Sequence, residues 1–418
     1  MSWMVGSRFS RRAALGFGVA MAAAVAVMQP GTSSAQETVK LGALIPLTGG
    51  LQSYGEGSMR GVRMAVQQVN AAGGLLDGRE VELVVGDTQT SPQPAVDAAQ
   101  RLVSVEGVAG IVGALGSGNT IPVAQTVSST NSIPQISNAS TAPALTTLDD
   151  DDFLFRTVPS DAYQGVALAQ IAADAGDTNV AVLYVNNDYG EGLAEAFEES
   201  LTEAGGTVTR SEAFEPNQAS YRSELSGLAG TGAEALVLIA YPDDGGLTIV
   251  RQSLEEGLFD RFILTDGMKA EGLLTEIGAE YLEGAYGTAA QAMESEAGEL
   301  WRAAYEAEYG ELPPLPYIDS AYDAAMILLL AIEKAGSTDG TAIRDAIREV
   351  SNAPGEVILP GEMEKARELI AAGTDIDYLG AAGDQEFDEN GDVSGTFEHW
   401  AIQDGEIATV RVFDPSAE

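Results

Sequence analysis

The side chains that support enzyme catalysis are scarce in this sequence. His399 is the single histidine, and the chain contains no cysteine. A Ser-His-Asp triad would have to use His399, and no G-x-S-x-G nucleophile elbow occurs. Zinc and non-haem iron sites usually need several histidine or cysteine ligands, and the acidic turn at 388–393 lacks the ligand spacing of an EF-hand. We therefore predict no metal, no cofactor and no catalytic residues; an exported hydrolase that uses carboxylates remains the enzymatic alternative.

Two loops rich in glycine and hydroxyl residues offer binding chemistry instead. Residues 116–120 read Gly-Ser-Gly-Asn-Thr, and residues 138–143 read Asn-Ala-Ser-Thr-Ala-Pro. Neither loop has the lysine of a P-loop or the G-x-G-x-x-G order of a dinucleotide fold. Free N–H groups at the start of the helices that follow would suit a carboxylate, although ordinary N-capping explains both loops equally well.

The elements that must position these loops follow a repeating order. Short apolar runs predict strands at 39–46, 81–86, 109–115 and 133–137, and again at 180–185, 208–214, 235–240 and 262–265. Amphipathic stretches between the runs predict helices, so the chain is α/β with parallel sheets in two lobes. Both loops fall at the carboxyl ends of strands, where open α/β sheets bind ligands.

The last part of the chain departs from this order. Helices are expected near 296–309, 320–335 and 341–350, followed by an irregular region at 354–384 with one helix at 362–372. The chain finishes with a turn at 387–393, where Asn390-Gly391 is a hairpin-turn pair, and then with apolar alternation from Trp400 to Phe413.

The first 35 residues are typical of a secretory signal. Ser10-Arg11-Arg12 precedes an apolar stretch at 13–28, and small residues at 33–35 suit cleavage. The paired arginines favour the twin-arginine route. Because this stretch is shorter than the ~20 apolar residues that span a bilayer, and no later segment is long and apolar enough, we expect a soluble periplasmic chain that is not membrane-embedded.

The formal net charge of −42 narrows the choice of partners. Nucleic acid is disfavoured because phosphate binding needs clustered lysine and arginine. A strongly acidic, solvated surface suits a salt-rich habitat, where screening weakens self-repulsion.

Several motifs, taken together, carry a resemblance to a known family. They lie at 41–49 with 53–55, and at 61–74, 113–120, 136–143, 187–192 and 388–395. In this combination the chain resembles the leucine/isoleucine/valine-binding proteins, the periplasmic receptors of branched-chain amino acid ABC transporters. The resemblance implies a type 1 periplasmic binding fold, in which two Rossmann-like lobes are joined by a three-strand hinge. Lobe one would comprise 37–159 and 289–395, and lobe two 160–288 and 396–418.

The resemblance also implies a set of ligand-binding residues. Hydroxyls of Ser117 and Thr141, with backbone groups of Ala139 and Thr141, would hold the ligand carboxylate and share its ammonium, which Asp266 would face. Both charges of a zwitterion need such partners when it leaves water. Four tyrosines would line or cover the side-chain pocket, with a partly buried core position as the alternative for each: Tyr54, Tyr189, Tyr241 and Tyr322.

The expected function is capture of an amino acid, branched-chain or otherwise aliphatic, and its delivery to an ABC transporter permease by a monomer. A receptor of the same fold for an amide, urea or aromatic acid is the alternative. The chain departs from well-known family members in lacking a first-lobe disulfide, and Asp266 is shorter than the glutamate often found there. These departures bear on stability and on the size of the ligand.

Overall fold

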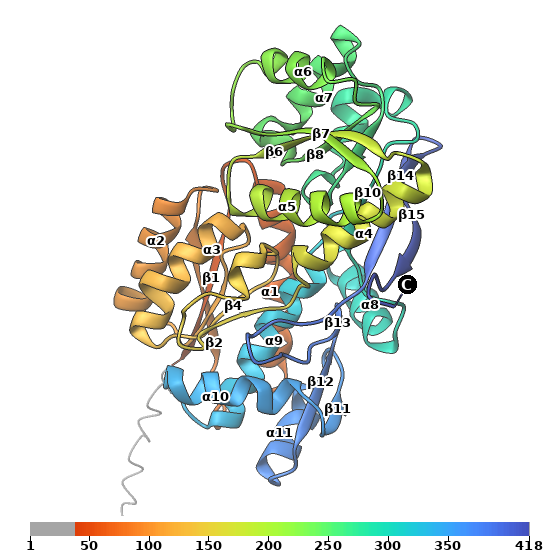
Figure 1. Ribbon diagram of the computed structural model, residues 1–418. Helices are drawn as coiled ribbons and strands as arrows, with labels where there is room; N and C mark the ends of the chain where they lie inside the picture. The colour runs from red at the N-terminus through yellow and green to blue at the C-terminus, as the bar shows by residue number, and fades with distance from the viewer. Residues whose placement is uncertain (1–37, 418) are drawn as a thin grey trace, which may run out of the picture. The chain divides into compact units, whose positions relative to one another are not determined.

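The computed structural model describes residues 38–417, so the predicted signal at 1–35 lies outside the described residues. Within the described range the chain builds two lobes around parallel sheets (Figure 1). The sheet of lobe one has the order β2-β1-β3-β4-β5, and all its pairs are parallel. Its strands are β1 (Val39–Ile45), β2 (Val81–Asp87), β3 (Ile111–Gly113), β4 (Gln135–Ser137) and β5 (Leu154–Arg156).

Helices from two distant parts of the chain complete lobe one. The early ones are α1 (Gln52–Ala71), α2 (Pro92–Arg101) and α3 (Ser117–Val123). The later ones are α8 (Glu296–Tyr309), α9 (Ile318–Ala335) and α10 (Gly340–Ser351). Helix α9 packs along α1, and 14 of its 18 residues are buried. Such an all-round apolar helix belongs in the centre of a lobe, where it covers one face of the sheet.

The sheet of lobe two has the order β15-β14-β10-β9-β8-β6-β7. Its parallel strands are β6 (Asn179–Val185), β7 (Thr207–Phe214), β8 (Ala235–Ile239), β9 (Phe262–Leu264) and β10 (Tyr286–Ala290), and the antiparallel pair β14 (Phe397–Gln403) and β15 (Glu406–Phe413) extends one edge. The helices of this lobe are α4 (Asp161–Ala175), α5 (Asp188–Glu203), α6 (Arg222–Ala229) and α7 (Leu247–Glu256).

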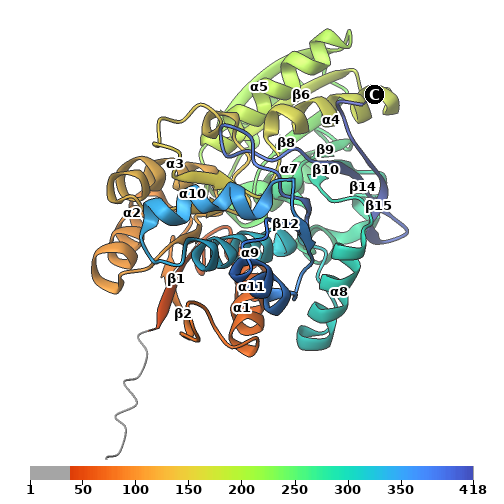
Figure 2. The same cartoon turned by 90° about the horizontal axis from the view of Figure 1, so that it is seen from below.

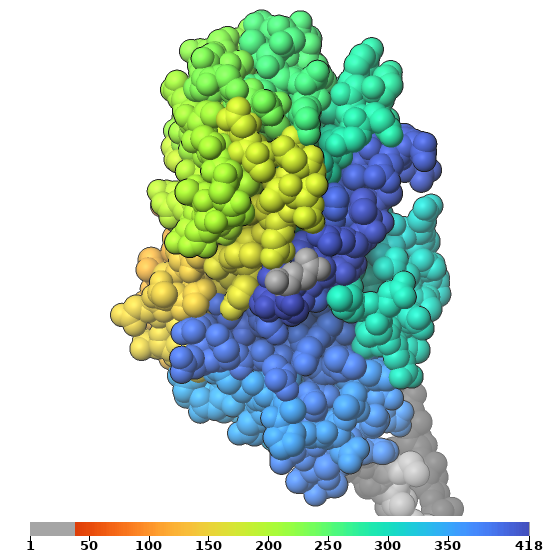
Figure 3. Space-filling model, turned by 45° about the vertical axis from the view of Figure 1, so that its right-hand side comes forward, coloured from red at the N-terminus to blue at the C-terminus, as the bar shows by residue number. Residues whose placement is uncertain are grey.

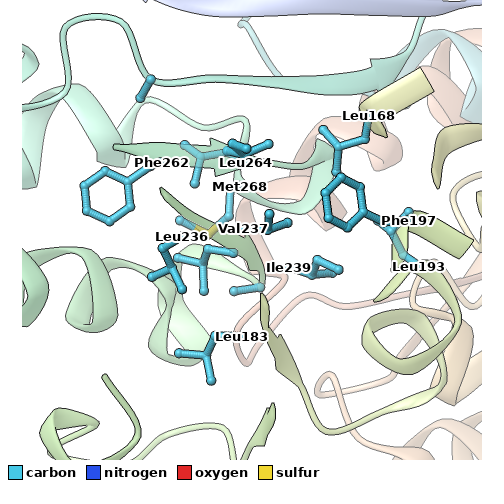
Figure 4. Close-up of a cluster of buried hydrophobic side chains, with 14 of the residues drawn as sticks. Leu168, Leu183, Leu193, Phe197, Leu236, Val237, Ile239, Phe262, Leu264 and Met268 are labelled. Carbon is cyan, nitrogen blue, oxygen red and sulfur yellow. The ribbon is translucent and has the colours of Figure 1, made fainter. Parts of the chain in front are cut away.

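Strand β8 shows why the central strands read as apolar runs and not as alternating patterns. All five of its residues are buried, because helices cover both faces of the sheet. Figure 4 shows this packing, with Leu236, Val237 and Ile239 of β8 lying near Phe197 of α5 and Met268.

The chain passes from one lobe to the other three times, through residues 157–160, 291–295 and 385–396. These segments lie side by side. Gln291 N donates to Thr396 O over 3.0 Å, and Thr396 Oγ1 donates to Gln291 O over 2.6 Å. A Cβ placed on Gly395 would lie 3.0 Å from the ring of Pro159. Three adjacent crossings are an arrangement about which lobes can close as rigid bodies; the lobe boundaries stay a prediction.

The region at 354–384 is more regular than the sequence suggested. It forms a small sheet of β11 (Glu356–Ile358), β12 (Ile376–Gly380) and β13 (Gly383–Asp384), together with α11 (Met363–Ala371). Figure 2 shows α11 and β12 beside α9. Ile358, Ile376 and Tyr378 are fully buried, and this apolar contact orders strands too short to be recognised from their sequence.

The end of the chain is fastened to lobe two. In Figure 3 the dark blue C-terminal segment lies against the yellow residues of α4. Gln170 Nε2 donates to Pro415 O over 3.3 Å, and Arg411 pairs with Asp174 at 3.1 Å. Among the helices of residues 38–417, none has both the length and the apolar composition needed to cross a bilayer.

Candidate ligand-binding site

A cavity lies between the lobes, at the carboxyl ends of their parallel strands. Lobe one lines it with Leu51, Tyr54, Leu115, Gly116, Ser117, Ala139 and Tyr317, and lobe two with Tyr189, Tyr241, Asp266 and Gly267. The inner cavity is small, about 20 Å³. It adjoins an outer cavity of about 500 Å³, whose lining shares Leu51, Gly116 and Tyr241 with the inner one. Six of the eight residues predicted for the ligand site line the inner cavity, so the fold gathers them from both lobes.

The two hydroxyl-rich loops of lobe one are held together by their own side chains. Thr120 Oγ1 accepts from Ala114 N at 3.0 Å and meets Ser140 Oγ at 2.7 Å, and Ser140 Oγ donates to Leu115 O at 2.9 Å. Ser137 Oγ donates to the same Ser140 hydroxyl at 2.7 Å. This network uses the hydroxyls of Thr120 and Ser140 for structure. Sequence reasoning could not divide the hydroxyls of the loops between structure and binding.

The side chains of Ser117 and Thr141 do not take part in that network. Ser117 is the first residue of α3, and its Oγ accepts from Ala142 N at 3.2 Å. Thr141 is 1 % exposed and does not line the cavity itself. Its carbonyl accepts from Arg156 Nη1 at 3.0 Å and from Asp161 N at 2.8 Å, while its hydroxyl meets no partner among the described residues.

Asp266 enters the cavity from lobe two, directly after β9 and Thr265. Its carboxylate accepts three hydrogen bonds: from Gln164 Nε2 at 2.9 Å, from Tyr189 OH at 2.8 Å and from Tyr317 OH at 2.7 Å. Burial raises the pKa of Asp266, and these neutral donors reduce the rise without reversing it. The result is an oriented carboxylate that has no cationic partner in the part of the chain described by the structure.

The tyrosines build the walls. Tyr189 and Tyr241 stack with ring centroids 5.3 Å apart and ring planes 16° apart. Tyr54, from lobe one, donates to Gly267 O of lobe two at 2.9 Å and so ties the lobes together across the cavity. Tyr317 supplies the fourth ring and has a left-handed φ of 74° just before α9.

Tyr322 does not line the cavity. It is fully buried in the core of lobe one, where its OH donates to Gln68 Oε1 at 2.5 Å and accepts from Gly361 N at 2.9 Å. Tyr317 was missed because its position depends on the turn after residues 313–316. The proline-rich approach to α9 was the only signal in the sequence.

Comparison with known proteins identifies the family to which this chain belongs. Residues 38–369 match the model of a family described as periplasmic binding protein. The chain is 30% identical to a leucine-, isoleucine-, valine-, threonine- and alanine-binding protein of Pseudomonas aeruginosa, over 76% of this chain and 83% of that one. It is 28% identical to a Leu/Ile/Val-binding protein homolog of Brucella abortus, over 81% of this chain and 88% of that one.

Solved structures agree. A leucine binding protein of Thermotoga maritima superposes with a TM-score of 0.77 at 29% identity, covering 91% of this chain and 100% of that one. A branched-chain amino acid binding protein of Streptococcus pneumoniae in complex with isoleucine has a TM-score of 0.75 over 91% of this chain and all of that one, and its 24% identity speaks to the fold alone. The chain belongs to the periplasmic binding protein family, among the relatives of the leucine/isoleucine/valine-binding proteins.

Proposed function

We propose that this protein captures an amino acid, branched-chain or otherwise aliphatic, between its lobes and delivers it to an ABC transporter permease. The observation that carries the proposal is the meeting of Ser117 and Ala139 from lobe one with Asp266 from lobe two in one cavity. The names of the leucine- and isoleucine-binding relatives support the choice of ligand class.

The chemistry of the lining suits a zwitterion. The Ser117 hydroxyl and backbone N–H groups of the two loops can donate to a carboxylate. Within the lining, the Ala139 carbonyl and the Asp266 carboxylate can accept from an ammonium. Charge-assisted hydrogen bonds of this kind offset the loss of hydration when a small charged molecule is buried. The rings of Tyr54, Tyr189, Tyr241 and Tyr317 supply apolar walls for an aliphatic side chain.

Closure of the lobes would couple occupancy to transport. The Tyr54 bond to Gly267 O crosses between the lobes at 2.9 Å, so the closed arrangement has contacts that separated lobes would lack. A ligand touching both sides shifts the population toward that arrangement, and a permease that recognises it then accepts the loaded receptor.

We further infer that the chain is a receptor and not an enzyme. No histidine or cysteine lines the cavity in residues 38–417, and His399 lies in β14 with its ring 5.6 Å from that of Tyr286. The chain would work in the periplasm as a soluble monomer after removal of residues 1–35.

A thermal-shift screen of the twenty amino acids on the protein without residues 1–35 tests the proposal. Leucine, isoleucine or valine should raise the melting temperature, because a ligand that binds only the native state stabilises it by mass action. Urea, small amides and benzoate are screened in the same way, because they represent the alternative ligand classes. A shift with one of these and with no amino acid would contradict the proposal. Recovery of unchanged ligand after denaturation would separate a receptor from a carboxylate hydrolase.

A further inference from the structure

A second cavity, here called the hinge cavity, lies beside the crossing at 291–295. Figure 1 shows α8 below the β14–β15 pair, and the cavity of about 200 Å³ has residues of both in its lining. Lobe one lines it with Trp301, Arg302 and the segment 312–319, and lobe two with Lys269, Ile407 and Thr409. Tyr317 lines the hinge cavity and the inner cavity alike, so the two spaces share one wall.

Trp301 brings a hydrogen-bond donor to the hinge cavity. It lies in α8 and is 3 % exposed, and its Nε1 meets no partner in the part of the chain that the structure describes. Buried indole N–H groups usually find an acceptor. Trp400 Nε1 is unpaired as well, but Trp400 lines neither the hinge cavity nor the inner one. An acceptor on a bound molecule would account for the donor of Trp301.

Arg302, the next residue of α8, brings a positive charge. Its guanidinium forms no hydrogen bond and no ion pair within residues 38–417. The chain has 63 acidic and 21 basic residues, so partners for a cation are plentiful and a cation without one is unusual. Lys269 lines the same cavity but is already paired with Glu398. The open donors are therefore the Arg302 guanidinium and the Trp301 indole, which together suit a carboxylate.

Asp319 brings a negative charge to the same cavity. It is half-buried near the start of α9, and its Oδ1 accepts from Ser320 N at 2.9 Å. Burial raises its pKa, and that hydrogen bond together with the charges of Arg302 and Lys269 opposes the rise. Arg302 and Asp319 thus attract each other, yet no ion pair joins them. Two opposite charges that line one cavity without touching leave room for a molecule between them.

We propose that the hinge cavity is a second solute site, which binds a small zwitterion of the amino-acid type. The carboxylate of the solute accepts from Trp301 Nε1 and from the Arg302 guanidinium, and its ammonium donates to Asp319. A simple anion would face the Asp319 carboxylate, and a simple cation would leave the indole N–H without an acceptor. A solute with both charges satisfies all three side chains. This site goes beyond the proposed function and does not depend on it.

Tryptophan fluorescence reports on this cavity directly. In the protein without residues 1–35 the remaining tryptophans are Trp301 and Trp400, and Trp400 is fully buried in the core of lobe two. The measurement uses Asp266→Ala, so that the inner cavity contributes little. This variant leaves the proposed contacts in place, because Trp301, Arg302 and Asp319 all belong to lobe one.

Glycine, acetate and methylamine are titrated at constant ionic strength, because they carry both charges, the negative one and the positive one. Glycine should change the emission at about tenfold lower concentration than acetate or methylamine, since it makes charge-assisted hydrogen bonds at both ends. Trp301→Phe should abolish the emission change. An emission change that persists in Trp301→Phe would place the bound solute elsewhere and overturn the proposal.

Two variants and a matched control assign the contacts. Arg302→Gln should weaken glycine binding roughly 10- to 100-fold, the usual effect of losing a hydrogen bond to a charged group. Arg63→Gln removes the same charge from α1, where Arg63 also forms no ion pair and lies outside the cavity, and it should bind glycine as its parent does. Asp319→Asn should weaken glycine but not acetate, and it keeps the Oδ1 that accepts from Ser320 N.

The remaining outcomes each contradict the proposal. Equal affinity for glycine and acetate, unchanged in Asp319→Asn, would make the cavity an anion site only. Equal losses in Arg302→Gln and Arg63→Gln would show a general effect of charge. No emission change and no heat of binding with any of the three solutes would leave the cavity without a ligand. None of these results touches the proposed function, which the thermal-shift screen on the wild type tests separately.

Discussion

Asp323 and Asp161 are both fully buried, but they differ in their hydrogen-bond partners. Asp323, inside lobe one, accepts from Tyr378 OH at 2.7 Å, from Ala381 N at 2.8 Å and from Ala382 N at 2.7 Å. Asp161, the first residue of α4, is equally buried, and neither of its carboxylate oxygens has a hydrogen-bond partner in the described chain. The first arrangement holds the small sheet at 356–384 against α9. In the second arrangement burial raises the pKa of Asp161, and only Thr141 and Arg156 oppose that rise.

The difference indicates how to read buried charge in this fold. A carboxylate with all its donors on the chain fastens structure, and its removal should be felt in stability. A carboxylate that lines the cavity and has no cationic partner should affect binding when it is removed. Asp266 shares features of both, because neutral side chains orient it and no cation within residues 38–417 neutralises it.

The largest effect on the binding side is expected at Asp266. Asp266→Ala should cost about 3–5 kcal/mol of amino-acid binding, because the ligand ammonium loses its partner in a buried space. The fold should persist, but the melting temperature should fall, because Gln164, Tyr189 and Tyr317 lose their shared acceptor. Calorimetry measures the affinity and circular dichroism the stability. Wild-type affinity in this variant would remove Asp266 from the site.

The largest effect on the structural side is expected at Asp323. Burial raises its pKa to about 7, whereas the carboxyl of an unfolded chain titrates near 3.8. Between these values the native state binds the proton more tightly, so the contribution of Asp323 to the free energy of unfolding falls as the pH rises from about 4 to about 7. The size is on the order of 2–4 kcal/mol.

Urea unfolding of wild type and Asp323→Asn between pH 4.5 and 8 measures this contribution. The variant cannot titrate there, so the difference between the two proteins should shrink or reverse as the pH rises. Comparing the two proteins cancels the pH dependence of the many surface acids. A constant difference across the range would show that Asp323 stays charged in the native state. Leucine affinity should be the same in both proteins, in contrast with Asp266→Ala.

The sequence allowed the fold and most of the cavity lining to be predicted, and failed where long-range packing decides. Apolar runs such as β8 identify buried parallel strands on their own. Arg156 does not pair with Asp161, because it forms its ion pair with Asp392, more than 200 positions away. Tyr317 and Tyr322 are chemically alike and five positions apart, so only the turn before α9 decides which ring reaches the cavity. Local pattern carries no information on such contacts.

A smaller effect is expected where the lobes touch at the rim of the outer cavity. A Cβ on Gly50 of lobe one would lie 2.0 Å from Cγ of Asp244 in lobe two, and Asn217 holds that carboxylate at 3.0 Å. Gly50→Ala should therefore disfavour closure and weaken leucine binding about tenfold, without altering any residue of the inner cavity. Small-angle scattering with saturating ligand should show less compaction than in the wild type. Gly205→Ala, where a Cβ meets no atom within 4 Å but φ is 86°, controls for a general loss of stability.

The smallest effect separates the two tyrosines and sharpens the comparison between the clusters. Tyr317→Phe removes a donor to Asp266 and should weaken leucine binding by about 1 kcal/mol, while Tyr322→Phe removes bonds to Gln68 and Gly361 and should cost about 1 kcal/mol of stability instead. Each variant deletes one hydroxyl from a buried ring, so they are matched controls for each other. Calorimetry measures the leucine affinity of both variants, and urea unfolding measures their stability. If Tyr322→Phe weakens binding and Tyr317→Phe does not, the binding site includes the core of lobe one around Tyr322. The division between binding and structural residues would then fail.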